Sequence, residues 1–176
     1  KNQIESSADD IFNVGESLFD DFDRKGDDWA VGWILQVLKK HKPIFFNENK
    51  FTSWFQTESA VNINYDELQL YLLNQEFESA DRLTSSFLRK LSGKSAEKRG
   101  YVFFSEVKNI PIIDLQTIDR LWTVYSNGKF AFSIQAKILK SVDQKYELLW
   151  PKIGWKKDGL WTRYPSSFSW SLEAPD

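Results

Sequence analysis

Apolar residues recur every three or four positions along most of the chain, which is the spacing of amphipathic helices. The pattern predicts a helix over residues 11–22, a second over residues 29–41 that stops before Pro43, and a third over residues 47–56. Together these three segments predict a small N-terminal helical bundle over residues 1–62. A separate core domain is expected over residues 63–176.

The stretch from Tyr65 to Gly93 predicts two antiparallel helices. Leucines mark the first helix, which breaks at Asn74 and Gln75, and a second apolar stripe runs to Leu91. Two helices joined by such a short turn form a helical hairpin. No second copy follows at a period of about 34 residues, so an array of helical repeats is excluded.

The second half of the chain predicts more helices and an aromatic C-terminal region. Residues 94–111 predict a loop with a short helix or an extended piece. Asp114 is expected to cap a helix that ends at Asn127–Gly128, with Trp122 and Tyr125 on its core-facing side. Helical spacing continues from Phe130 to Leu139, and loops rich in Trp, Gly and Pro follow a last short helix. The predicted fold class is therefore all-α.

Aromatic residues make up 16% of the chain, with 14 Phe, 8 Trp and 6 Tyr. This excess indicates either a large aromatic core or a flat, apolar ligand. The 23 basic and 25 acidic residues nearly balance, which argues against a nucleic-acid-binding protein because such proteins are usually strongly basic. With no Cys and one His, thiolate chemistry, disulfides and Cys/His zinc sites are excluded.

Charge is unevenly distributed along the chain. Residues 1–28 hold nine acidic and three basic residues, whereas residues 82–108 hold seven basic and two acidic ones. A second basic stretch contains Lys152, Lys156, Lys157 and Arg163. Solvated surface is the simpler interpretation of both basic stretches. Because each lies beside aromatic residues, recognition of an anionic planar ligand is the alternative. A macrocycle with carboxylates, a single-stranded nucleic acid or a sugar chain would use the same residue types.

The sequence predicts no catalytic residue and no metal site. The only histidine, His41, ends an apolar helix and has no evident nucleophile partner. Residues 92–95 read Ser-Gly-Lys-Ser, but the position where a phosphate-binding loop needs its first glycine is Leu88. This short segment therefore predicts the end of a helix followed by a basic loop.

Residues 114–122 and 125–135 resemble the signature of the genomes-uncoupled-four family, which comprises porphyrin-binding regulators of magnesium chelatase in oxygenic phototrophs. Further segments resemble the family in the same order. They are residues 65–91, 103–107, 149–156, 161–165 and 168–170.

The resemblance implies an all-helical core shaped like a cupped hand, with an aromatic-lined cleft. Protoporphyrin IX or its magnesium form is the expected ligand, and no obligatory cofactor or nucleic acid is implied. The chain would activate magnesium chelatase through its large porphyrin-binding subunit in chlorophyll biosynthesis, without being an enzyme itself. A chloroplast or a cyanobacterial cytoplasm is the expected location, with a monomer and peripheral membrane association expected.

The resemblance also implies which residues bind the porphyrin. They are Phe103, Phe104, Val107, Ile110, Trp155 and Tyr164, with Lys152 and Arg163 as partners for the propionates. Because Phe103 and Phe104 are consecutive, one is expected in the core and Phe104 in the cleft. Without the resemblance, the residue pattern alone favours the alternative, a helical protein-interaction module with no small-molecule ligand.

Overall fold

The computed structural model describes residues 28–41 and 57–172, so the helices predicted over residues 11–22 and 47–56 lie outside the described residues. Nearly all of the described regular structure is helical, which confirms the all-α class. The elements in chain order are α2 (Asp28–His41), α3 (Asp66–Leu73), α4 (Phe77–Ser92), α5 (Lys94–Arg99), the 3-10 helix η3 (Phe104–Asn109), α6 (Ile112–Tyr125), α7 (Phe132–Ser141), α8 (Tyr146–Lys152), β1 (Lys156–Lys157) and β2 (Leu160–Trp161).

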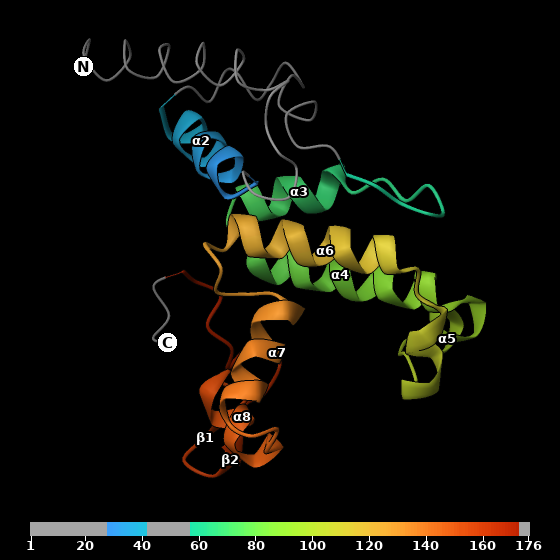
Figure 1. Cartoon of the computed structure of the whole chain (residues 1–176), viewed down its shortest axis with the longest axis vertical. Coiled ribbons are helices and arrows are strands. Elements are labelled where there is room, and N and C mark those ends of the chain that lie inside the picture. The colour runs from blue at the N-terminus through green and yellow to red at the C-terminus, as the bar shows by residue number, and fades with distance from the viewer. Residues whose placement is uncertain (1–27, 42–56, 173–176) are drawn as a thin grey trace.

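Helices α3, α4 and α6 enclose the hydrophobic core (Figure 1). The predicted hairpin is present as α3 and α4, and Ala80 is fully buried where the two helices approach. The predicted positions of Trp122 and Tyr125 in the core are confirmed, since both side chains are buried. The Trp122 indole N–H donates to the Thr84 hydroxyl at 2.9 Å, and the Tyr125 hydroxyl donates to the Gln69 side-chain oxygen at 2.9 Å.

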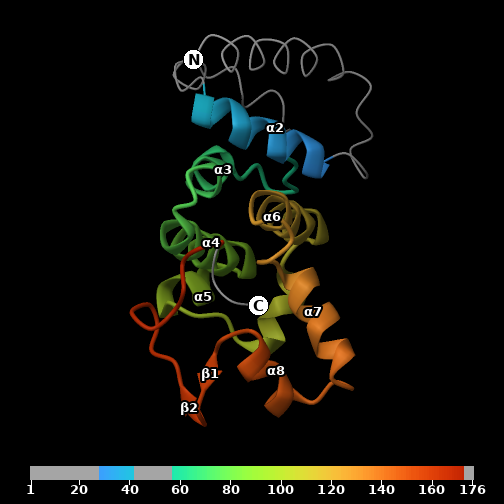
Figure 2. The same cartoon turned by 90° about the vertical axis from the view of Figure 1, so that its left-hand side faces the viewer.

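Helix α2 packs across α3 and α6 (Figure 2). Leu35 and Leu38 are fully buried and join the same hydrophobic cluster as the residues of α3 and α6. The Gln36 side-chain amide donates to the Tyr125 carbonyl at 3.2 Å. A Cβ added at Gly32 would lie 2.0 Å from a methyl carbon of Val124, so a larger side chain there would prevent this close packing.

The predicted capping role of Asp114 is wrong. Helix α6 begins two residues earlier, with Pro111 at the N-cap position. The Asp114 carboxylate is instead fully buried and accepts hydrogen bonds from the Ser59 hydroxyl at 2.6 Å, the Ala60 amide at 3.0 Å and the Tyr65 hydroxyl at 2.7 Å. It therefore attaches the segment before α3 to the start of α6. The capping carboxylate of the next helix is Asp119, which accepts from the Ser133 amide at 2.8 Å at the start of α7.

Two projections leave this core at different places (Figure 1). One consists of α5 and η3, so the basic loop predicted after Gly93 is a short helix. The other is an arm made of α7, α8 and a small hairpin of β1 and β2. The hairpin was predicted as a loop, but Asp158 and Gly159 both have positive φ, as a two-residue hairpin turn requires.

Candidate functional site

Four exposed apolar side chains gather on η3 and the residues that lead into it. We call this surface the η3 patch, and its members are Tyr101 (53% exposed), Phe103 (49%), Phe104 (97%) and Val107 (45%). One of the consecutive rings of Phe103 and Phe104 was expected in the core, but both are exposed. A phenylalanine as exposed as Phe104 gains almost nothing from folding, which makes it a candidate contact residue.

Arg99 holds the η3 patch in place. Its guanidinium carbon lies 4.0 Å from the centre of the Phe103 ring and 4.7 Å from that of Tyr101. The same guanidinium forms a partly buried ion pair with Glu106 and donates to the Tyr101 carbonyl at 3.1 Å. Glu106 in turn accepts from the Phe103 amide at 2.8 Å. Arg99 is therefore engaged inside the patch, and the basic residues left for an anionic ligand lie elsewhere.

The arm carries the second aromatic surface, a chain of contacting rings that we call the aromatic ladder. Its centre is the Trp150–Trp155 pair, whose rings are nearly parallel, with an interplanar angle of 7° and 5.4 Å between centres. Each remaining ring contacts at least one other member at 5.6–6.5 Å. The members are Tyr146, Trp150, Trp155, Trp161, Tyr164, Phe168 and Trp170.

Tyr164 links the aromatic ladder to the core. Its hydroxyl is hydrogen-bonded to the carboxylate of Asp81 on α4, and its ring contacts Phe168 and Trp170. Burial raises the pKa of Asp81, while the hydrogen bond from Tyr164 and the charge of Arg82 lower it. Burial and the same hydrogen bond raise the pKa of Tyr164. The contact fixes one edge of the Tyr164 ring against α4 and leaves the side chain 52% exposed.

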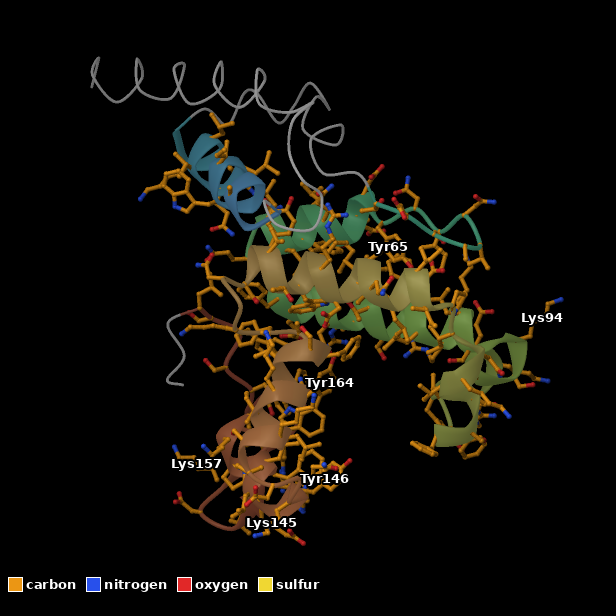
Figure 3. All side chains as sticks on the ribbon, in the orientation of Figure 1. Tyr65, Lys94, Lys145, Tyr146, Lys157 and Tyr164 are labelled. Atoms are coloured by element: carbon orange, nitrogen blue, oxygen red, sulfur yellow. The ribbon has the colours of Figure 1, made fainter. Side chains whose placement is uncertain are left out.

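The rings of Tyr146 and Tyr164 lie on the side of the arm that faces the α5–η3 end of the molecule in Figure 3. Lys157 lies on the opposite side of the arm in the same view, and Lys94 lies at the outer edge of the other projection. The two aromatic surfaces therefore stand on separate projections of one core, and α4 contacts both, through Asp81 and through η3.

The structure divides the predicted site residues between the η3 patch and the arm, except for Ile110, which is buried. Phe103, Phe104 and Val107 belong to the η3 patch, whereas Trp155 (39% exposed) and Tyr164 belong to the aromatic ladder. Ile110 is only 6% exposed and is part of the core cluster. Lys152 and Arg163 are exposed on the arm, and neither forms an ion pair with any described residue.

Sequence reasoning missed two exposed apolar residues and the Asp81–Tyr164 contact. Ile112 (72% exposed) and Ile113 (43%) lie at the start of α6, off the core-facing stripe of that helix. That off-stripe position was a usable signal. Asp81 had none, because nothing local relates it to Tyr164. Among the described residues there is no cluster of three or more potential metal ligands, and none of the described helices is long and apolar enough to cross a membrane.

Comparison with known proteins gives a family match over residues 58–176, to the family described as GUN4-like. A Ycf53-like protein of Synechocystis is 40% identical over 150 residues, which cover 83% of this chain and 64% of that protein. The chloroplastic tetrapyrrole-binding protein of Arabidopsis thaliana is 41% identical over 115 residues, which cover 61% of this chain and 43% of that protein. The chain thus spans less than two thirds of either relative.

The fold is also found in solved structures. The structure of GUN4 from Chlamydomonas reinhardtii superposes with a TM-score of 0.65 at 38% identity, over 68% of this chain and 81% of that one. The ligand-free GUN4 of Arabidopsis thaliana gives 0.56 at 41% identity, over 66% of this chain and 78% of that one. The family match spans the segment before α3, the helical core, the η3 patch and the aromatic ladder. On this evidence the chain belongs to the GUN4-like family.

Proposed function

We propose that this chain binds a tetrapyrrole, protoporphyrin IX or its magnesium form, between the η3 patch and the aromatic ladder. The observation that carries the proposal is the exposure of Phe104, 97% of whose surface is accessible beside other exposed rings. Complete burial of such a side chain contributes about 1.5–3 kcal/mol. A flat macrocycle between two aromatic surfaces would supply that burial on both of its faces. The printed name of the Arabidopsis relative, a tetrapyrrole-binding protein, supports the same ligand class.

The carboxylates of such a ligand need cations at the edge of the site, because an unpaired carboxylate is costly to bury. Arg99 is occupied by Glu106 and two rings, so it is a poor candidate. Lys152 and Arg163 are exposed beside the aromatic ladder and free of ion pairs with described residues. We assign the propionates to these two side chains.

Tetrapyrrole binding would serve regulation rather than catalysis. Membership of the GUN4-like family supports a regulator that activates magnesium chelatase through its large porphyrin-binding subunit, in a chloroplast or a cyanobacterium. A chelatase assay tests this step. The chain should raise the rate of magnesium insertion, and Phe104→Ala should need more protein or porphyrin for the same rate. Equal stimulation by the wild type and by Phe104→Ala would show that stimulation does not depend on porphyrin binding at Phe104.

A specific observation favours the second candidate, a protein-interaction module. Leu160 (74% exposed) and Trp161 (61%) stand at the hairpin of the arm, beside Lys156 and Lys157. An exposed apolar tip next to basic residues suits a protein partner. Under this alternative, partner binding would be independent of porphyrin, and Phe104→Ala would leave it unchanged.

Titration with deuteroporphyrin, a soluble dicarboxylate porphyrin, tests the binding proposal directly. Tryptophan emission should fall to a plateau, and Phe104→Ala should weaken the apparent affinity about tenfold, since about 1.4 kcal/mol corresponds to a factor of ten. Leu70→Ala is the matched control, because Leu70 is also exposed, at 41%, but lies on α3. A linear, unsaturable loss of emission, or equal affinities for the two variants, would overturn the proposal.

A further inference from the structure

A pocket of about 440 Å³ lies between the C-terminal turn of α2 and the end of α3, in elements that carry neither the η3 patch nor the aromatic ladder. This volume is within the range of small-molecule sites, roughly 300–1,000 Å³. Its lining residues combine an aromatic ring, apolar side chains, two amino groups and amides: Trp33, Gln36, Val37, Lys39, Lys40, Leu73, Asn74 and Gln75.

Two features of the pocket lack an explanation in the fold. Trp33 is 54% exposed although a ring of this size is usually mostly buried. Lys39 is partly buried, and like Lys40 it forms no ion pair with a described residue.

A helix-end role explains only part of this arrangement. Lysines in the last turn of α2 stabilise the helix dipole, and that accounts for their presence in the sequence. It does not account for the exposed indole of Trp33. Gln36 needs no ligand, because its amide already donates to the Tyr125 carbonyl at 3.2 Å.

The charges around the pocket limit the ligand. Burial lowers the pKa of Lys39, and the nearby Glu76 raises it. Two ammonium groups and one carboxylate leave a small positive excess, which suits a single carboxylate better than a doubly charged phosphate. Trp33 with Val37 and Leu73 favours an apolar ring on the ligand.

We propose that this pocket is a second binding site, specific for a small aromatic carboxylate. The carboxylate would bind Lys39 and Lys40, and the ring would lie against Trp33. Since α2 lies outside the family match and packs on α6, the site would be a property of the segment before the family core.

The probe is indole-3-carboxylate, which has the ring and the carboxylate. The chain is labelled with 5-fluorotryptophan, and the fluorine resonance of Trp33 is assigned with Trp33→Phe. The Trp33 resonance should shift saturably with the probe, and Lys39→Gln should weaken binding about tenfold. Lys137→Gln, an exposed lysine of α7, is the matched control and should leave binding unchanged.

A second ligand tests the role of the carboxylate without a change in the protein. Indole lacks the carboxylate, so it should bind more weakly than the probe. The proposal is wrong if the Trp33 resonance does not move, if indole binds as well as the probe, or if only the Trp155 and Trp161 resonances move. A negative result in this experiment would not affect the porphyrin proposal, because the porphyrin titration tests Phe104.

Discussion

The guanidinium of Arg99 lies 4.0 Å from the centre of the Phe103 ring while it forms an ion pair with Glu106. The Arg99 side chain thus orients the Tyr101 and Phe103 rings of the η3 patch. A cation that rests on a ring and binds a carboxylate is stabilised by both contacts, and the fork of donors on arginine allows them to form together.

Arg99→Gln should therefore destabilise the η3 patch. It removes two ring contacts and a charge-assisted hydrogen bond from side chains that are partly shielded from solvent, with an expected cost of about 2 kcal/mol. Urea unfolding would measure the loss, and hydrogen exchange should speed up over residues 103–109. Lys98→Gln, at the neighbouring exposed lysine, is the control and should change little. Identical unfolding curves for the two variants would show that Arg99 does not hold the patch.

Asp81 gives the stability of the core a pH dependence whose sign follows from its raised pKa. The folded protein binds the Asp81 proton more tightly than the unfolded chain does, because burial is the largest cause of the shift. The stabilising contribution is therefore complete below the ordinary value of 3.8 and is lost as the pH rises through the raised pKa. At neutral pH the charged carboxylate costs stability, with Arg82 and the Tyr164 hydroxyl as compensating partners and Glu78 opposing them.

Asp81→Asn should thus be at least as stable as the wild type at pH 7, because the substituted amide keeps an oxygen that can accept from Tyr164. Any advantage should shrink as the pH falls toward 4, where the wild-type carboxyl binds its proton. Urea unfolding from pH 4 to pH 7 would measure this trend. A variant that is less stable at pH 7 by an amount that persists at pH 4 would show that burial does not dominate at Asp81.

Because the Tyr65 hydroxyl donates to a buried carboxylate and that of Tyr71 to an exposed one, removing them should lower the free energy of unfolding by different amounts. Tyr65→Phe removes one of three donors to a fully buried carboxylate and should lower the free energy of unfolding by about 1–2 kcal/mol. Tyr71→Phe removes only an exposed hydrogen bond of 3.2 Å to Glu67 and should leave the free energy of unfolding nearly unchanged. Chemical denaturation measures both, and equal costs would contradict the structural role assigned to Asp114.

The predictable part of the fold is the part that local spacing controls. The apolar stripes of α3, α4 and α6 face the core because helical side chains three and four apart share a face, so Trp122 and Tyr125 could be placed from sequence. The hairpin of β1 and β2 was also predictable, because Asp158–Gly159 is a strong turn signal.

The rest depends on contacts that no local pattern contains. Asp114 resembled a helix cap, but its partners Ser59, Ala60 and Tyr65 lie about fifty residues earlier in the chain. Arg99 is one of seven basic residues between positions 82 and 108, and only the path of the chain into η3 brings it onto Tyr101 and Phe103. The resemblance named the site residues, whereas their division between two projections and the burial of Ile110 needed the structure.

Hydrogen exchange with and without deuteroporphyrin shows whether one porphyrin contacts both the η3 patch and the aromatic ladder. Exchange should slow in two separate segments, residues 101–109 and residues 146–170, and should stay the same in α2. Slower exchange in only one of these segments, or in neither, would contradict a site formed by the two surfaces together.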